Sequence, residues 1–366
     1  MAYTYGTVKA LFTAICNAIR AKDGTVEEID HQDIPDRISK IETNLEAQLY
    51  TDDGKSRLLI EVEDGGTFKC AGNTNNNRKL LINWGDGTTE TTPDEPFSGT
   101  FLHTYETGGQ YLITFESLGD VAGTAYRFAA TLKRGNDRSY LEGRNTILGV
   151  SLGRNAYLSS ITVNDRSDLI RLVVFLEAGN AYAFGSNFTA ASCVNLRFVD
   201  IIADEDVQAT TTPLFQSCDS LPSIKLPPVT SIKTNTFSSC YSLKDVYLPP
   251  CVTTINNNAF NTCYGLTNIT LPESLATLNK AFSYSTNLES VIITREDAVT
   301  TASASDLFAL NTKIEKGEGH IYVPDALLTD YQAATNWTKY SAQMVPWSQA
   351  PDWVKGILVE RGHTVS

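Results

Sequence analysis

Four stretches of this sequence repeat one another: FQSCDSLPSIKLPP (residues 215–228), FSSCYSLKDVYLPP (237–250), FNTCYGLTNITLPE (260–273) and FSYSTNLESVIITR (282–295). Each begins with Phe, and these phenylalanines recur at intervals of 22, 23 and 22 residues. Three positions later comes Cys, or Ser in the last copy, and then the pattern apolar-x-x-apolar-x-apolar. A unit repeated at this period predicts a solenoid, in which each coil adds one short strand to a parallel ladder and buries its apolar face against its neighbours.

The apolar pattern also occurs before the four full copies. It recurs at Ile147/Val150/Leu152, Leu158/Ile161/Val163, Leu169/Leu172/Val174 and Leu196/Val199/Ile201. The spacing and the period are typical of leucine-rich repeats. The first three of these copies are 11 residues apart, which is too short for a full coil. They are therefore either strands of a sandwich-like unit or degenerate coils with a different turn.

The form of the repeat, with Phe, Cys, Leu and a closing Leu-Pro, resembles the BspA-like repeats of bacterial surface proteins. The stretch from His320 to Pro324 and the aromatic residues Tyr331, Trp337 and Tyr340 resemble the closing segment of that family. We assign residues 147–345 to the solenoid and 346–366 to a C-terminal tail or cap.

Ahead of the solenoid, short apolar runs are separated by turn-rich stretches. The runs are Leu58–Val62, Leu80–Trp84, Phe101–Tyr105 and Tyr111–Phe115. Several short strands with this punctuation predict a β-sandwich over residues 57–120. The motif from Trp84 to Gly87, followed by His103, Tyr105 and Tyr111, resembles a PKD-type immunoglobulin-like domain. That resemblance implies a core Trp, a tight Gly-Asp-Gly turn and a role as a spacer or adhesive module.

The N-terminus reads as two short helices. Val8, Leu11, Phe12, Ile15 and Ile19 lie on one face of the first. Residues 11–38 resemble an element of phage and prophage virion proteins that precedes variable binding domains. We therefore predict that residues 1–42 are a helical docking segment for other virion proteins, joined to the sandwich by a polar linker over 43–56.

Composition excludes several classes of function. The net charge of −13 argues against nucleic acid and against an anionic membrane surface, because both need clustered Lys and Arg. We find neither an apolar run long enough to span a bilayer nor a signal peptide, and so expect folding in a cytoplasm. Seven scattered cysteines suggest reduced, buried thiols rather than disulfides.

No constellation of residues indicates catalysis. The four histidines fall in separate predicted segments, and nothing in their spacing or in that of the carboxylates marks an active site. Asp86 and Asp94 are candidate calcium ligands, although a turn explains Asp86 more simply. The aligned cysteines Cys193, Cys218, Cys240 and Cys263 lack the paired local spacing of metal ligands, so we interpret them as packing residues. We predict no enzyme activity, no metal and no cofactor.

The residues between the apolar strand positions point outward and are the candidate binding residues. Our predicted ligand site combines five of them, Lys225, Asp245, Tyr247, Asn268 and Thr270, with Tyr241 and Tyr264, which share one repeat position and are expected to form an exposed aromatic pair. Their mixture of polar, charged and aromatic side chains suits sugar or protein recognition, while a solvated face without a ligand is the equally weighted alternative.

The sequence as a whole predicts a mainly β, multidomain protein with short N-terminal helices, an immunoglobulin-like sandwich and a leucine-rich-repeat solenoid. Its expected function is that of a bacteriophage virion protein, tail-associated and homotrimeric, that binds host-surface glycan or protein. A structural virion decoration without a receptor, a bacterial surface adhesin and a glycan depolymerase are the alternatives.

Overall fold

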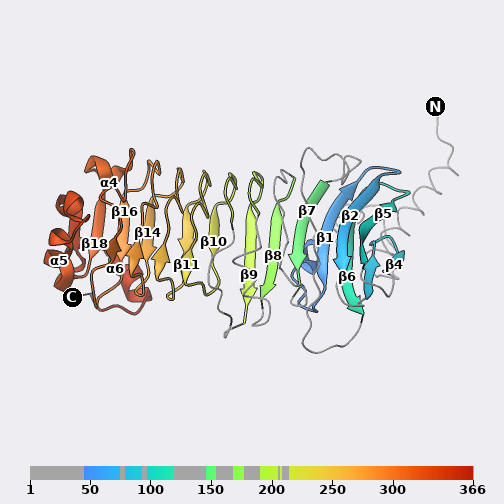
Figure 1. The fold of residues 1–366 in the computed structure, drawn as a ribbon, viewed down its shortest axis with the longest axis horizontal. Coiled ribbons are helices and arrows are strands. Elements are labelled where there is room, and N and C mark those ends of the chain that lie inside the picture. Colours follow the sequence, from blue (N-terminus) through green and yellow to red (C-terminus); the bar gives the residue numbers. More distant parts are fainter. Residues whose placement is uncertain are drawn as a thin grey trace, which may run out of the picture.

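The computed structural model describes residues 45–74, 79–92, 97–118, 146–153, 168–176, 190–204, 207 and 214–365 (Figure 1). The helices predicted within residues 1–42 and the apolar copy at Leu158 lie outside the described residues. In Figure 1 the strands follow one another along the long axis, from the first sheet at one end to short helices at the other.

The first sheet has seven strands in the order β4-β3-β6-β1-β7-β8-β9. Their bounds are β1 (Ser56–Val62), β3 (Lys79–Asn83), β4 (Thr89–Thr91), β6 (Gly109–Leu118), β7 (Thr146–Leu152), β8 (Arg171–Leu176) and β9 (Phe198–Ala203). Strands β4, β3, β6, β1 and β7 pair antiparallel, whereas β7, β8 and β9 pair parallel. The parallel ladder of the solenoid therefore continues directly from the antiparallel N-terminal strands.

A second sheet pairs β2 (Thr67–Thr74) with β5 (Phe97–Thr104). Phe68 of β2 and Phe101 of β5 belong to the same buried cluster as Ile60 and Ile113 of the first sheet. Two sheets with a common core are what the predicted β-sandwich requires. The PKD-type identity of this unit stays a prediction.

The strands before the full repeats show how the solenoid begins. Gly149 of β7 pairs with Arg171 of β8, a step as long as that from Phe215 to Phe237. The copies at Ile147 and Leu169 are therefore parallel strands one coil apart.

Later coils carry one strand on each of two faces. One face carries two ladders: β10 (Ser223–Lys225) pairs with β12 (Asp245–Tyr247), and a separate ladder contains β14 (Asn268–Leu271), β16 (Ser290–Ile293), β18 (His320–Val323) and β19 (Met344–Pro346). The other contains β11 (Ser231–Ile232), β13 (Thr254–Ile255), β15 (Thr277–Leu278) and β17 (Thr301–Ala302). We call the outer surface of β10, β12, β14, β16 and β18 the strand face.

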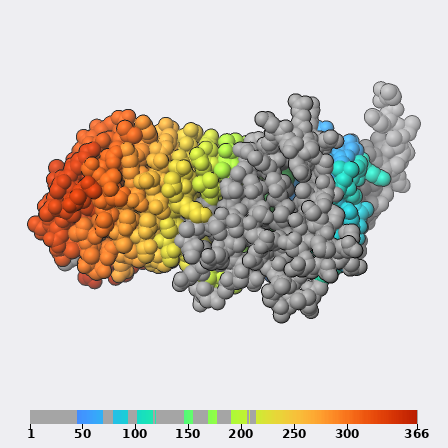
Figure 2. Space-filling view, viewed as in Figure 1, coloured from blue at the N-terminus to red at the C-terminus, as the bar shows by residue number. Residues whose placement is uncertain are grey.

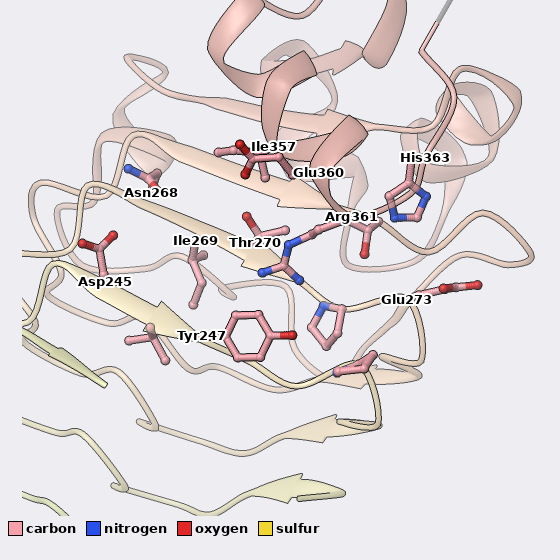
Figure 3. Close-up of a pocket in the computed structure, with 14 residues that line it drawn as sticks. Asp245, Tyr247, Asn268, Ile269, Thr270, Glu273, Ile357, Glu360, Arg361 and His363 are labelled. Atoms are coloured by element: carbon pink, nitrogen blue, oxygen red, sulfur yellow. The ribbon is translucent and has the colours of Figure 1, made fainter. Parts of the chain in front are cut away.

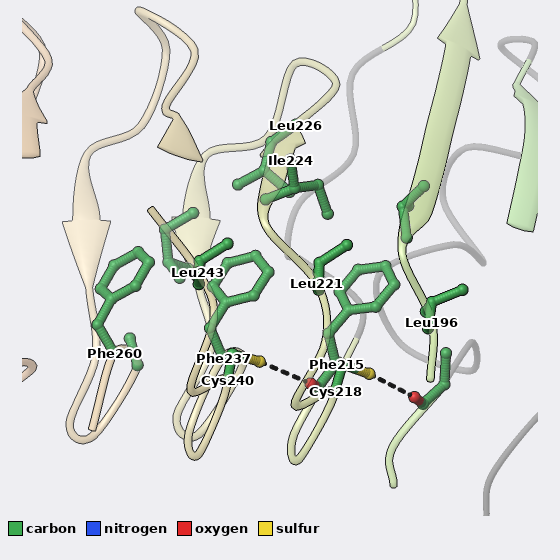
Figure 4. Packing of buried hydrophobic residues seen from close by; sticks show 14 of the residues in the cluster. Leu196, Phe215, Cys218, Leu221, Ile224, Leu226, Phe237, Cys240, Leu243 and Phe260 are labelled. Atoms are coloured by element: carbon green, nitrogen blue, oxygen red, sulfur yellow. Dashed lines mark hydrogen bonds between the residues drawn. The ribbon is translucent and has the colours of Figure 1, made fainter. Parts of the chain in front are cut away.

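The repeated phenylalanines form a buried stack along the solenoid axis. Ring centroids of Phe215, Phe237, Phe260, Phe282 and Phe308 are 5.9, 5.4, 5.4 and 5.7 Å apart in turn, with nearly parallel planes. All five are fully buried. Figure 4 shows three of these rings side by side with the leucines of the same coils. The predicted solenoid of coils with a shared apolar interior is confirmed.

The C-terminal part closes the solenoid with short helices. They are α4 (Lys313–Lys316), η1 (Asp325–Leu327), α5 (Leu328–Ala333), η2 (Thr338–Gln343), η3 (Trp347–Gln349) and α6 (Asp352–Glu360). Buried Tyr331, Trp337 and Tyr340 cover the end of the core, and the Trp337 Nε1–H donates to the Thr300 carbonyl at 2.7 Å. This aromatic cap supplies the partners that a further coil would otherwise provide.

Candidate ligand groove on the strand face

The outward positions of neighbouring strands line up in two rows. Ser223 pairs with Asp245, and Lys225 pairs with Tyr247, so each side chain stands beside its equivalent in the next coil. These four residues are exposed, as their sequence positions predict. The inward positions Ile224 and Leu248 are buried. The alternation of a β-strand therefore presents polar groups and an aromatic ring to the outside on β10 and β12.

Farther along, the same row becomes apolar and is covered. Thr270 pairs with Ile292, and Ile292 pairs with Tyr322. Helix α6 lies on this part of the strand face, where Val354 and Leu358 form a second buried cluster with Ile292 and Tyr322. Exposure of Thr270 falls to 9% and that of Ser290 to 5%, so these two outward positions are largely buried, whereas Asp245 and Tyr247 are exposed.

A groove of about 600 Å³ lies where the open part of the strand face meets the end of α6 (Figure 3). Its floor comes from β12 and β14, and its wall from the last turn of α6 and the residues that follow it. The lining residues with polar side chains are Asp245, Tyr247, Asn268, Thr270, Glu273, Thr294, Glu360, Arg361 and His363. Four of the seven predicted ligand residues, namely Asp245, Tyr247, Asn268 and Thr270, are thus brought together.

The Tyr247 ring is the aromatic surface of the groove, and two cationic side chains lie against it. The Lys225 Nζ is 5.5 Å from its ring centroid, and the Arg361 Cζ is 5.4 Å from it. The ring is 44% exposed, so part of it stays open to a ligand. Cation–π contacts hold both side chains near the ring without using their N–H donors. The fifth predicted residue, Lys225, thus contacts the Tyr247 ring but does not itself line the groove.

Arg361 is half-buried at the wall of the groove. Within the part of the chain that the structure describes, no carboxylate lies within ion-pair distance of its guanidinium, and no side chain or carbonyl accepts a hydrogen bond from it. Burial lowers the pKa of Arg361, because desolvation disfavours its charged form. The groove thus holds a partly desolvated cation whose donors are free for a ligand.

Acidic side chains supply the acceptors of the same groove. Asp245, Glu273 and Glu360 are all exposed. A fourth carboxylate, Glu296, is held by His363, with Oε1 2.6 Å from Nδ1. Single charges of both signs around an aromatic ring favour a ligand that both donates and accepts hydrogen bonds.

The two remaining predicted ligand residues lie elsewhere. Tyr241 and Tyr264 stack on each other with centroids 5.3 Å apart and planes 12° apart. Both are exposed, but neither lines the groove. The expected exposed aromatic pair is present, and it lies outside the groove that Tyr247 lines. Each tyrosine follows the Cys position of its coil, before the strand begins.

The repeat pattern does not predict three residues of the groove wall, Glu360, Arg361 and His363, because they belong to no repeat. The signal for them was the apolar spacing of Val354, Ile357 and Leu358, which marks a helix with one apolar face. An apolar outward row on β16 and β18 was the complementary signal.

The cysteines of the repeat are structural donors. The thiols of Cys218, Cys240 and Cys263 donate to backbone carbonyls of the preceding coil, at 3.1 Å in each case. Figure 4 shows the first two of these bonds. No cluster of ligands suited to a metal ion occurs among the described residues.

Asp86, a candidate calcium ligand, forms hydrogen bonds within its own turn. Its carboxylate accepts from the Thr88 N–H at 2.9 Å and from the Thr88 hydroxyl at 2.7 Å, and pairs with His103 at 2.7 Å. Burial opposes the charged form, but the Thr88 and His103 contacts outweigh it and lower the pKa of Asp86 to about 2. Gly85 and Gly87 adopt positive φ, so the predicted tight turn is present. Asp94 lies outside the described residues.

Comparison with known proteins bears on the repeats. Residues 186–315 match, in six copies, the model of a family described as "BspA type Leucine rich repeat region". The repeats within residues 186–315 are thus of the BspA leucine-rich type. No curated protein matches. Two solved chains match, one of them from the crystal structure of "T. pallidum Leucine Rich Repeat protein (TpLRR)", with 17% identity, 60% of this chain and 90% of that chain covered, and a TM-score of 0.29.

The BspA-type repeats point to a protein-binding or adhesin-like role. In Figure 2 the coils from β9 to the C-terminus form one continuous elongated body. None of the helices in the described ranges has the length and apolarity that crossing a bilayer requires.

Proposed function

We propose that this protein is a non-enzymatic attachment protein that binds a glycan of a bacterial host surface through the groove beside Tyr247. The observation that carries this proposal is a half-exposed tyrosine ring in a polar groove at the open end of the strand face. Aromatic rings bordered by planar polar side chains provide both apolar contact and oriented hydrogen bonds, which hydroxyl-rich ligands need.

We further propose that the protein belongs to a bacteriophage virion and is tail-associated. Its support is the pattern of residues 11–38, which resembles the element ahead of variable binding domains in virion proteins. Residues 1–42 would then dock on other virion proteins, and three copies would gain avidity from repeated weak contacts. The PKD-type sandwich would serve as the spacer. A bacterial surface adhesin is the second candidate, because BspA-type repeats fit that setting equally well.

Binding is tested with the full chain on an array of bacterial surface polysaccharides. We expect specific glycans to be retained, and Tyr247→Ala to remove binding while thermal unfolding is unchanged, because the Tyr247 side chain is exposed. Tyr241→Ala is the matched control, since it removes an equally exposed tyrosine outside the groove. A blank array with folded protein would contradict a glycan ligand and leave a structural or protein-binding role.

Two further measurements separate the remaining alternatives. Mass spectrometry of purified virions and of washed bacterial envelopes decides between a virion protein and a surface adhesin. A reducing-end assay on the bound glycans tests the absence of catalysis. Turnover that disappears on substitution of one carboxylate, such as Asp245→Asn, would make the protein a depolymerase.

A further inference from the structure

We propose that the ligand of the groove is an acidic saccharide, and that Arg361 binds its carboxylate beside the Tyr247 ring, where Lys225 adds a second positive charge. This inference rests on the proposed function, because it names the chemical class of the ligand at the same site. The group that selects a negatively charged ligand, the Arg361 guanidinium, then comes from the C-terminal segment, which belongs to no repeat.

The Arg361 guanidinium is placed to bind an anion. It lies over Tyr247 at 5.4 Å and lines a groove large enough for a sugar unit. Among the described residues, no carboxylate or carbonyl uses its N–H donors, although three carboxylates line the same groove. A guanidinium presents its donors as a planar fork that matches a carboxylate, and such pairs are stronger when partly desolvated. The free donors therefore select for an anion.

Lys225 brings a second positive charge to the Tyr247 ring. Its ammonium is 5.5 Å from the Tyr247 centroid and comes from the neighbouring coil, whereas Arg361 comes from the end of α6. No described residue forms an ion pair with it either, and Lys225 is exposed. Two unpaired cations on one aromatic ring create a local positive spot on a chain whose net charge is −13.

The carboxylates that line the groove restrict the class of anion that can bind there. Asp245, Glu273 and Glu360 surround this spot and can only accept hydrogen bonds when ionised. They repel a doubly charged phosphate, whereas sugar hydroxyls donate to them and leave one carboxylate to the cations. Asn268, which donates and accepts, adds a further partner for hydroxyls. A uronate or sialate unit meets both requirements, which an acidic peptide, with few hydroxyls, does not.

The experiment compares matched ligands on the full chain. The probes are polygalacturonate and the same polymer with its carboxyls reduced to alcohols, and sialyllactose and lactose. We expect binding to the carboxylate form of at least one pair and loss of at least tenfold in affinity for its neutral form. The two pairs distinguish a uronate from a sialate as the source of the carboxylate. Binding that ignores carboxyl reduction, or that prefers phosphorylated glycans or acidic peptides, would overturn the inference.

Variants test the two cations. We expect Arg361→Gln to weaken binding of the acidic probe roughly tenfold to a hundredfold, as loss of a charge-assisted hydrogen bond does, and Lys225→Gln to weaken it less. Arg361→Lys keeps the charge but loses the fork, so its affinity should fall between those of wild type and Arg361→Gln. Lys316→Gln removes the same charge from an exposed residue of α4 and should change nothing.

Each result has a defined meaning. If Arg361→Gln lowers the unfolding temperature, Lys225→Gln carries the test, because it lies on a different coil and is exposed. Equal affinity of wild type and both Gln variants for the acidic probe would overturn the assignment of the cations while the proposed glycan function stands. A fully folded chain that binds no acidic, neutral or array glycan would overturn the proposed function itself.

Discussion

Cys263 and Ser285, which occupy the same position in successive coils, are joined by a hydrogen bond from the Cys263 N–H to the Ser285 Oγ at 3.1 Å. The Ser285 hydroxyl in turn donates to the Phe260 carbonyl at 2.6 Å, just as the Cys263 thiol donates to the Phe237 carbonyl at 3.1 Å. The coils of Cys240, Cys263 and Ser285 thus each place one small donor under the carbonyl of the preceding Phe. The position requires a short side chain with a hydrogen to donate, and Cys and Ser both satisfy it.

The donor position predicts a difference between two substitutions of Cys240. Its thiol donates to the Phe215 carbonyl at 3.1 Å and is fully buried. Cys240→Ala leaves that carbonyl without its partner and opens a small cavity, so we expect a loss of roughly 1–3 kcal/mol in unfolding free energy. Cys240→Ser keeps a donor and should lose less. Urea unfolding measures both, and an equal loss would show that packing alone decides the position.

The same burial predicts where alkylating reagents act. Desolvation raises the pKa of Cys240 to about 12 and raises that of Cys218 and Cys263 as well. Because the thiolate is the reactive form, these three should resist iodoacetamide at pH 8 until the solenoid unfolds. Site-resolved mass spectrometry with and without urea checks this. Rapid labelling of Cys240 in the native protein would contradict the closed coil.

The repeat could be predicted from sequence because one set of side chains recurs in register. Phe237 stacks on the equivalent rings of both neighbouring coils, the Cys240 thiol donates to the preceding coil and Leu243 is buried, so a single copy predicts the environment of the next. The outward direction of Asp245 and Tyr247 follows from strand alternation in the same way.

The groove could be predicted only in part, because its second wall comes from outside the repeat. Spacing placed Tyr247 and Asn268 on one surface, but nothing in the period shows that α6 turns back onto β16 and packs against Ile292. Arg361 reaches Tyr247 through a tertiary contact more than a hundred residues away in sequence. Likewise, the pairing of β1 with β7, which joins the sandwich to the solenoid, has no local signal.

The Asp86–His103 pair predicts acid sensitivity in the N-terminal sandwich. The pKa of Asp86 is lowered to about 2 from 3.8, so its ionised form stabilises the fold fully above about pH 4, and this contribution is lost as the pH falls through 2. His103 also stacks on the core Trp84 at 4.8 Å, which couples the turn to the core. Because solvent reaches the pair, we expect Asp86→Asn to cost only about 1 kcal/mol at pH 7. Unfolding followed from pH 7 to 2 should show the wild-type advantage shrinking below pH 4.

The aromatic cap predicts a larger effect from one buried residue. Trp337 is fully buried, packs edge-on against Tyr331 at 5.3 Å and donates to the Thr300 carbonyl. Trp337→Ala should cost roughly 3–5 kcal/mol, because it leaves a cavity and an unpaired carbonyl at the end of the core. Hydrogen exchange should show the last coils opening first. Trp353→Ala, at 47% exposure, is the matched control and should cost far less.

Helix α6 predicts a separation between folding of the solenoid and formation of the groove. Val354 is fully buried against the outer side of β16 and β18, whereas Val359 of the same helix is 61% exposed. Val354→Asp places a charge in that contact and should detach α6, exposing Ile292 and Tyr322 and withdrawing Arg361 from Tyr247. The Phe stack lies in the separate inner core and should persist, so circular dichroism and the main unfolding transition should change little while dye binding to exposed apolar surface rises. Val359→Asp makes the same chemical change on the solvent side and should leave both signals as in wild type. If Val354→Asp bound glycan as well as Val359→Asp, the C-terminal wall would have no part in the ligand site.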